Sequence, residues 1–303
     1  MSAVQHPTLC IYHGNCADGF GAAWVVRKAL GADIEFHAGH YGAEPPAVDG
    51  KNVVIVDFSY PYATLVELAD RAASLLILDH HKSAQADLAG VFDAGQTFEQ
   101  FNSVCKAECA SCNTSHVGQL FDMDRSGAGI TWDFFFPGQP RPDLINHIED
   151  RDLWLFKLDG TREIQANLFS YPYDFAVWDQ LFAASVDTLR EGGQAIERKH
   201  HKDIGELVAV TKRRMVIGGH DVPVASLPYT LTSDAGHLMA QGEPFAACYW
   251  DTPHGRSFSL RSTDEGLDVS AIAGLYDGGG HRNAAGFRVP YGHDLATEWR
   301  PVE

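Results

Sequence analysis

A run of four apolar residues leads directly into Asp79-His80-His81, and this junction constrains the fold more than any other feature of the sequence. The run, Leu75 to Leu78, is short and continuous, which is typical of a buried strand in a parallel sheet. In open α/β sheets, ligands bind in the crevice beyond the carboxyl ends of the strands. Carboxylate and imidazole together are ligands for manganese, iron, cobalt or zinc. Taken alone, the triplet fits a metal site and a capped strand end equally well.

Acidic or histidine side chains also follow three other apolar runs. These are His13 and Asp18 after Leu9 to Tyr12, Asp57 after Val53 to Val56, and Asp150 with Asp152 after Leu144 to Ile148. Ionised carboxylates that crowd together repel one another, and bound cations are the simplest way to make such a group tolerable. The repeated pattern therefore favours a shared metal site over a set of unrelated caps.

The charge of the chain limits its partners. The net charge is −17, from 23 basic and 40 acidic residues. Tight binding of long nucleic acid depends on lysines and arginines that displace counterions, so we expect no long duplex partner. A short phosphorylated ligand is compatible with this charge, because metal ions and a few arginines reverse the sign locally.

The sequence predicts neither a membrane span nor a secretion signal. No apolar run approaches the roughly 20 residues of a spanning helix, and the stretch from Met1 to Pro7 lacks a basic start and an apolar core. We therefore expect a cytoplasmic enzyme without a membrane partner. In that compartment the six cysteines should be reduced, with Cys10 and Cys248 buried as packing residues.

The order of the predicted elements indicates an α/β protein with two domains. Strands at 9–12, 34–37, 53–58 and 75–78 alternate with helices at 19–30 and 62–74, which predicts a parallel sheet. A polar helical stretch then precedes a strand-rich region with strands at 222–225, 245–249 and 258–261. We predict a first domain at 1–185, a linker helix at 186–215 and a smaller α/β domain at 216–303.

Three consecutive glycines precede His281 in the second domain. Such a run has a large entropic cost on folding, so we infer that its backbone N–H groups closely approach a ligand, most plausibly phosphate oxygens. The basic pair His281-Arg282 directly after it favours an anion site over a merely flexible loop.

Together these motifs resemble the DHH phosphoesterases that carry a C-terminal DHHA1 domain. The resemblance rests on Asp79-His80-His81, Asp57, His13 with Asp18-Gly19, and the late Gly-Gly-Gly-His, in the same order over nearly the whole chain. Ser126-Gly127-Ala128-Gly129 and Ser259-Leu260-Arg261-Ser262 are most similar to the oligoribonuclease (nanoRNase) branch. Members cleave phosphoester bonds in short oligonucleotides, in cyclic or linear dinucleotides or in phosphoadenosine phosphate, usually with two manganese ions. The resemblance implies an active site in the cleft between the two domains.

The resemblance also implies a role for each matching residue. Asp57 would bridge two divalent ions, most often manganese, with magnesium, cobalt or zinc as alternatives. The other metal ligands would be Asp18, His80 and Asp150 at one ion and His13 at the other. His81 would contact the scissile phosphate, and Asp79 would orient a neighbouring imidazole. In the second domain the substrate would contact Arg261, Gly279, Gly280 and His281.

The chain departs from the family pattern at Cys16, which stands where the family usually has a first aspartate. Thiolate favours zinc or iron over manganese. Three alternatives stay open: Cys16 is a ligand, Asn15 or water replaces the ligand, or that ion binds weakly. The fourth motif has two candidates, and we prefer Asp150 to Asp152 because it lies nearer the end of the apolar run.

A cysteine-containing insert at about 96–120 carries Cys105, Cys109, Cys112 and His116. Three cysteines and a histidine at short spacing suit a structural zinc. A surface loop with reduced thiols fits equally well, whereas a radical-SAM cluster has no other support in the sequence.

The sequence therefore predicts a hydrolase that cleaves short oligonucleotides or dinucleotides with a water activated by two metals. Phosphoadenosine-phosphate phosphatase and cyclic-dinucleotide hydrolase are alternatives of the same class. A catalytically weak nucleotide-binding protein is an alternative of another class, motivated by Cys16. Several members of the family form dimers, so a homodimer is a further expectation that the resemblance raises.

Overall fold

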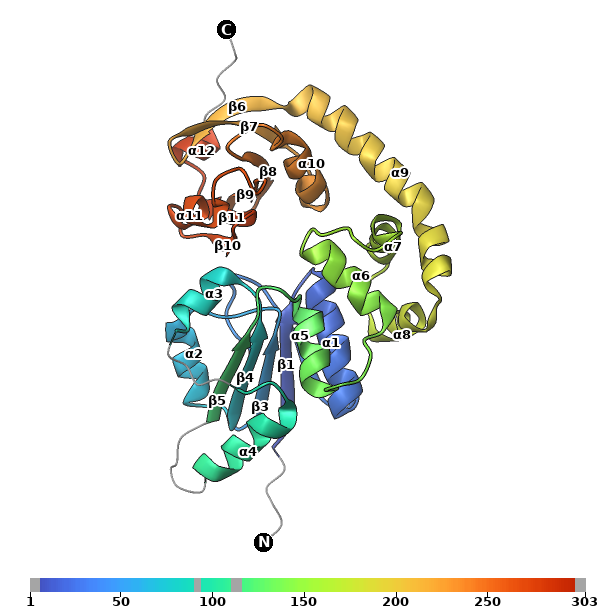
Figure 1. Cartoon of the computed structure of the whole chain (residues 1–303). Coiled ribbons are helices and arrows are strands. Elements are labelled where there is room, and N and C mark those ends of the chain that lie inside the picture. The colour runs from blue at the N-terminus through green and yellow to red at the C-terminus, as the bar shows by residue number, and fades with distance from the viewer. Residues whose placement is uncertain (1–5, 90–93, 110–115, 298–303) are drawn as a thin grey trace. The chain divides into compact units, whose positions relative to one another are not determined.

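The computed structural model describes residues 6–89, 94–109 and 116–297. The chain forms two compact units, residues 1–197 and 198–303 (Figure 1). The predicted linker helix is α9 (Val186–Thr211), and the division between the units falls within it.

The first unit contains a five-stranded, all-parallel sheet in the order β2-β1-β3-β4-β5. Its strands are β1 (Thr8–His13), β2 (Glu35–Gly39), β3 (Asn52–Val56), β4 (Ser74–Asp79) and β5 (His116–Phe121). The first four confirm the strands predicted from sequence. The strand order reverses between β1 and β3, and ligands bind beyond the carboxyl ends of the strands at such a switch point.

Alternate side chains of the strands enter two separate cores, one on each face of the sheet. Cys10, Val54 and Leu76 are buried on one face, and Leu9, Val53 and Leu75 on the other. Each fully buried aliphatic side chain contributes about 1.5–3 kcal/mol to stability. Because both faces are covered, the strands are apolar throughout, which is why they could be recognised in the sequence.

Helices cover both faces of this sheet, with α1 and α5 on one and α2 and α3 on the other (Figure 1). Their bounds are α1 (Ala17–Leu30), α2 (Tyr62–Ala69), α3 (Lys82–Asp87), α4 (Phe98–Cys109) and α5 (Gly127–Phe135). Three more helices follow: α6 (Asp143–Asp152), α7 (Thr161–Leu168) and α8 (Phe175–Ala183). The predicted helix at 62–74 is shorter than expected, since the chain turns after Ala69 to begin β4 at Ser74.

The described parts of the predicted insert at about 96–120 are helix α4 and strand β5, and both belong to the sheet domain. β5 pairs with β4 along its whole length, and Phe101 of α4 is buried. A Cβ at Gly118 of β5 would lie 2.9 Å from the Phe101 ring, so the glycine lets helix and strand pack closely. β5 could not be recognised as a strand from the sequence. It is an edge strand that contains Gly118 and Gln119, so it lacks the continuous apolar run of its neighbours.

The second unit is built on a six-stranded mixed sheet in the order β10-β11-β9-β8-β7-β6, in which β7 and β8 are parallel. Its strands are β6 (Arg213–Ile217), β7 (His220–Ser226), β8 (Ala246–Thr252), β9 (Gly255–Arg261), β10 (Gly279–His281) and β11 (Ala284–Val289). The helices are α10 (Thr232–Met239), α11 (Val269–Gly274) and α12 (Asp294–Thr297), with a short 3₁₀ helix at Tyr229–Leu231. Cys248 is fully buried on β8, as Cys10 is on β1, which confirms both predictions.

Two of the three glycines, Gly279 and Gly280, lie in strand β10, which excludes the alternative of a flexible loop for them. β10 pairs with β11, and two of the three glycines lie against that neighbour. A Cβ at Gly278 would lie 2.2 Å from the Gly286 carbonyl oxygen, and one at Gly280 would lie 2.6 Å from that of Ala284. Gly280 also has a φ of 141°, which disfavours any side chain. Close backbone packing therefore accounts for two of the glycines, and a phosphate contact remains a prediction.

Among the described residues, no helix combines the length and the apolar character that crossing a bilayer requires.

Candidate metal centre

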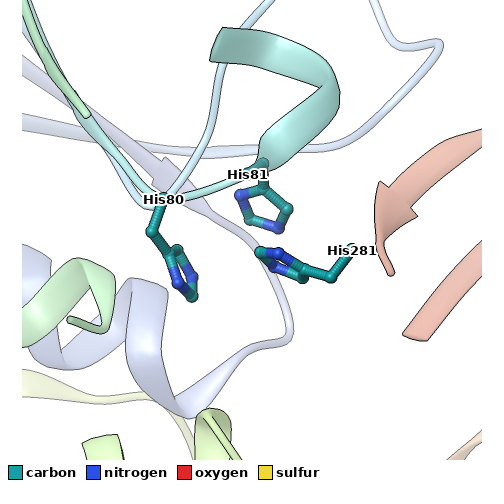
Figure 2. A group of neighbouring side chains, drawn as sticks. All are labelled: His80, His81 and His281. Carbon is teal, nitrogen blue, oxygen red and sulfur yellow. The ribbon is translucent and has the colours of Figure 1, made fainter. Parts of the chain in front are cut away.

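The Asp79-His80-His81 triplet lies where β4 passes into α3, and Figure 2 shows the side chains of its two histidines. One oxygen of its fully buried carboxylate, Oδ1, accepts a hydrogen bond from His81 Nδ1 at 2.7 Å. The same oxygen accepts the backbone N–H of His80 at 2.8 Å. Asp79 therefore holds the ring of His81 and the backbone of His80, and its predicted role of orienting an imidazole at a metal stays a prediction.

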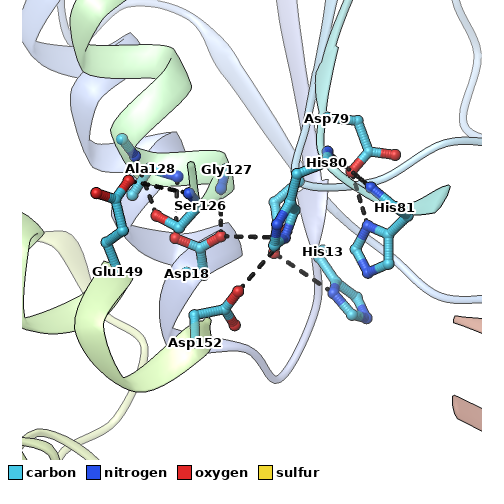
Figure 3. A network of polar contacts seen from close by, with 12 residues as sticks. His13, Asp18, Asp79, His80, His81, Ser126, Gly127, Ala128, Glu149 and Asp152 are labelled. Atoms are coloured by element: carbon cyan, nitrogen blue, oxygen red, sulfur yellow. Dashed lines mark hydrogen bonds and ion pairs between the residues drawn. The ribbon is translucent and has the colours of Figure 1, made fainter. Parts of the chain in front are cut away.

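Figure 3 shows a network of polar contacts that includes His13 and His80, and the imidazoles of both residues lie close to the carboxylate of Asp57. It follows β3, its N–H donates to the Leu78 carbonyl of β4 at 2.9 Å, and its side chain is almost fully buried. Oδ1 lies 3.1 Å from His80 Nε2, and Oδ2 lies 3.5 Å from His13 Nδ1. Within the described residues Oδ2 accepts no hydrogen bond. A buried carboxylate oxygen without a donor has a large desolvation cost unless a cation compensates it.

The backbone of Asp57 is strained. Its φ is 53°, in the left-handed region that non-glycine residues other than asparagine and aspartate rarely adopt. This conformation turns the chain at the strand end and aims the carboxylate across the carboxyl ends of β1 and β4. Such strain persists at sites whose surroundings fix it, and these are often functional.

Asp18, on the first turn of α1, is bound by the first turn of a second helix. Its oxygens accept N–H groups from Gly127 at 2.5 Å and from Ala128 at 2.9 Å, both on α5. Helix N-termini present unsatisfied N–H groups and a partial positive charge, so they hold a carboxylate well. The Ser126-Gly127-Ala128-Gly129 motif thus positions Asp18.

Glu149 anchors that same helix start and is a residue that sequence reasoning missed. Its Oε2 accepts the Ser126 N–H at 3.0 Å, and its Oε1 accepts Arg141 Nη1 at 2.8 Å. Glu149 was visible in the sequence only as part of an acidic run, because its partners are distant along the chain.

Asp152, not Asp150, faces the other site residues, which corrects the preference drawn from the sequence. Asp152 Oδ2 lies 3.4 Å from His80 Nε2. Asp150 instead accepts the N–H groups of Lys157 at 2.7 Å and Leu158 at 3.1 Å, and the Thr161 hydroxyl at 2.6 Å. The apolar run at 144–148 is part of helix α6, so neighbouring carboxylates point to different sides of it.

The two carboxylates should therefore respond differently to the same substitution. We expect Asp150→Asn to lower the free energy of unfolding by about 1–3 kcal/mol, because an amide cannot accept all three hydrogen bonds. We expect Asp152→Asn to change the stability of the metal-free protein by no more than about 0.5 kcal/mol. Urea unfolding monitored by circular dichroism measures both. A larger destabilisation in Asp152→Asn than in Asp150→Asn would contradict these assignments.

The electrostatics of the site follow from two buried carboxylates, Asp18 and Asp57, and the more exposed Asp152 around the imidazole of His80. Burial raises the pKa of Asp18 well above its ordinary value, and Asp57 and Asp152 add to the effect. Although burial lowers the pKa of His80, its hydrogen bond to Asp57 and the surrounding carboxylates raise it well above normal. Although burial raises the pKa of Asp57, His13 and His80 hold it well below its usual range. Without metal, protons thus offset the negative charge, and a divalent ion would displace them.

Asp57 brings ligand atoms together in three groups of the first unit. In one of them its companions, Asp79 and His81, are hydrogen-bonded to each other, and the other two groups have the geometry of metal ligands. Asp18, Asp57 and His80 offer ligand atoms within 4.8 Å of one another, and so do His13, Cys16 and Asp57. Asp57 belongs to both groups. Oxygen and imidazole donors, with the buried Asp57 Oδ2 that lacks a hydrogen bond, fit divalent ions such as manganese, cobalt or zinc. We call the five residues of these two groups, with Asp152, the ligand cluster.

The predicted substrate-binding residues lie in the second unit. Gly279, Gly280 and His281 form β10, the element from which Figure 2 draws His281. Arg261 ends β9, where it donates to Ser259 Oγ at 2.9 Å and to Ser233 Oγ at 2.7 Å. Their part in substrate binding, and the predicted cleft between the domains, remain predictions.

The predicted zinc ligands cannot be placed. Cys105 and Cys109 fall within the bounds of α4, and His116 begins β5. Cys112 and the side chains of all four lie outside the described residues, so the structural zinc remains a prediction.

Comparison with known proteins gives a relative but no family. No protein-family model matches the sequence. The chain is similar to an uncharacterised protein of Acanthamoeba polyphaga mimivirus, 29% identical over 306 residues that cover 91% of this chain and 66% of that protein. The chain thus spans just under two thirds of that relative.

Three solved structures are similar to this chain over most of its length, with low sequence identities and low TM-scores. One is PggH, a pGpG-specific phosphodiesterase from Vibrio cholerae, with 13% identity, 95% of each chain covered and a TM-score of 0.44. Another is an exopolyphosphatase-related protein from Bacteroides fragilis, with 11% identity, 94% and 87% covered and a TM-score of 0.38. A third is an uncharacterised protein from Helicobacter pylori G27, with 15% identity, 94% of each chain covered and a TM-score of 0.34.

Proposed function

We propose that this chain is a metal-dependent phosphodiesterase of the DHH/DHHA1 type that hydrolyses short oligonucleotides or dinucleotides. The observation that carries the proposal is Asp57, a buried and strained carboxylate shared by two groups of ligand atoms at the switch point of a parallel sheet. A carboxylate shared in this way suits a pair of divalent ions. When bound, such ions supply a nucleophile at neutral pH and neutralise charge on a phosphate.

The protein's own side chains would orient the substrate. Although burial lowers the pKa of His81, Asp79 raises it above its ordinary value and so favours the positively charged ring. Asp79 also holds His81 Nδ1, which leaves Nε2 as the atom to donate a hydrogen bond to a phosphate oxygen. The acidic net charge of −17 supports a short substrate over long nucleic acid.

Hydrolysis of a substrate panel tests the function. We expect turnover of a linear dinucleotide such as pGpG and of a five-nucleotide RNA in the presence of divalent metal, much slower turnover of long RNA, and none after chelation. The panel also contains a cyclic dinucleotide and phosphoadenosine phosphate, with Mn²⁺, Mg²⁺ or no metal.

Each outcome of the panel distinguishes one alternative. Equal turnover of long RNA and dinucleotide would contradict the preference for short substrates. Hydrolysis confined to phosphoadenosine phosphate or to the cyclic dinucleotide would replace the proposed substrate class. Retained nucleotide binding without turnover under any condition would favour a binding protein over an enzyme.

A further inference from the structure

The two groups of ligand atoms that share Asp57 differ in chemistry. Asp18, Asp57 and His80 offer only oxygen and nitrogen, whereas the group of His13, Cys16 and Asp57 includes a sulfur. Sulfur ligands select different ions from oxygen ligands, because soft thiolate prefers zinc, iron or cobalt to manganese or magnesium. The two positions are therefore not equivalent.

The backbone around Cys16 directs its side chain toward the group. The N–H of Gly14 donates to the Gly39 carbonyl at 2.9 Å, and Asn15 has a left-handed φ of 58°. Cys16 then occupies the N-cap of α1, but its side chain makes no capping hydrogen bond. Serine, aspartate or asparagine at an N-cap would stabilise the helix by about 1 kcal/mol. The cysteine gives up that contribution and places Sγ near His13 and Asp57 instead.

A second observation at the same place points to a cation. Asp57 is 1% exposed, and its Oδ2 accepts no hydrogen bond from the described residues. The nitrogen atom that faces this oxygen is His13 Nδ1, at 3.5 Å, which belongs to the same group. A buried carboxylate oxygen, an imidazole and a thiol within 4.8 Å of one another form a ligand set typical of zinc.

We propose that Cys16 binds, as a thiolate, one of two metal ions held by Asp57, and that this position selects Zn²⁺, Co²⁺ or Fe²⁺ over Mn²⁺ and Mg²⁺. The Asp18, Asp57 and His80 position keeps oxygen and nitrogen ligands and accepts the harder ions. The inference rests on the metal centre of the proposed function and adds the identity of the ion to it.

Cobalt substitution tests this directly, because thiolate bound to Co²⁺ gives an intense near-ultraviolet charge-transfer band. The full chain carries Cys105→Ser, Cys109→Ser and Cys112→Ser, so that these thiols cannot contribute. Metal-free protein is titrated with CoCl₂, and bound metal is counted by elemental analysis. We expect the band in this background and its loss in Cys16→Ser, with one fewer ion bound. Cys10→Ala, which removes a fully buried thiol on the strand that precedes Cys16, should retain the band.

A substitution that restores a hard ligand gives the second readout. In Cys16→Asp we expect the ratio of Zn²⁺ to Mn²⁺ affinity to fall by at least about tenfold, measured by competition with a chromophoric chelator. Thermal unfolding of the metal-free variants confirms that each is folded. The proposal is overturned if the band is absent from the background, if it persists in Cys16→Ser, or if Cys16→Asp leaves the affinity ratio unchanged.

These readouts do not require turnover. A thiolate band that depends on Cys16, in a protein that hydrolyses no phosphodiester, would support the metal assignment and contradict the proposed function. Hydrolysis by a protein that binds cobalt without a thiolate band would support the proposed function and contradict the metal assignment.

Discussion

Asp57→Asn is expected to lower kcat/KM for a dinucleotide by at least about 10³-fold, the largest effect of any single substitution in the chain. Electrostatic stabilisation by a bound metal contributes several kcal/mol to such a reaction, and each 1.36 kcal/mol corresponds to tenfold in rate. Asp57 lies in both groups of ligand atoms, so its loss removes a ligand from each. The measurement is steady-state hydrolysis with Mn²⁺ or Zn²⁺, together with elemental analysis of bound metal.

Asparagine is the suitable substitute because it adopts the left-handed backbone of position 57 as readily as aspartate does. Alanine would add backbone strain, so a loss of activity caused by a folding defect could not be distinguished from one caused by a loss of metal binding. Metal that binds only the folded protein raises its stability by about 2.7 kcal/mol at a concentration of 100 Kd. We expect this increment in the wild type and not in Asp57→Asn.

Asp70→Asn is the matched control, since Asp70 is an exposed aspartate of the same unit, located just after α2. It should retain activity, metal content and the metal-induced increment in stability. An Asp57→Asn variant that bound two ions and turned over dinucleotide normally would refute the assignment of Asp57 as the shared ligand.

Gly127→Ala is expected to reduce stability by about 1–3 kcal/mol and to impair metal binding with it. A Cβ at this position would lie 2.4 Å from Asp57 Cβ and 2.9 Å from Asp18 Oδ2. The start of α5 would have to move away from both residues, so Asp18 would lose the N–H groups that hold it. The loss should outweigh the gain of up to about 1 kcal/mol that alanine brings to a helix.

Gly205→Ala is the control for Gly127→Ala, because the same glycine-to-alanine substitution is expected there to raise stability rather than lower it. Gly205 is an exposed residue of α9, and a Cβ there meets no atom within 4 Å. We expect it to stabilise the protein by up to about 1 kcal/mol. Urea unfolding of both variants in chelator, and then with metal, separates packing from ligand binding. If Gly127→Ala were as stable as Gly205→Ala and bound metal fully, the close approach of α5 to Asp57 and Asp18 would not be needed.

The strands and most of the ligand cluster could be predicted because both leave local signals in the sequence. Both faces of the sheet are covered, so β3 and β4 are continuous apolar runs, and each run ends directly in a polar residue. Asp57 and His80 of the ligand cluster, and Asp79 and His81 beside them, were recognisable for that reason.

The sequence analysis misplaced or missed residues whose position depends on how a helix is rotated or whose partners are distant along the chain. Asp150 and Asp152 lie two residues apart on α6, and only the rotation of that helix decides which carboxylate faces His80. Glu149 acts on a helix start more than twenty positions away in the sequence. β5 is an edge strand with little apolar signal, so it was hidden inside an apparent insert.

By itself the sequence determined that several strand ends carry metal-ligating side chains, because hydrophobic periodicity and chemical type are local properties. Only the tertiary structure decided which side chains converge. Strand order places β1 beside β3, so the residues after these two strands meet at a switch point. The same convergence places Cys16 with His13 and Asp57, since ligand geometry depends on distances between segments rather than on the order of residues.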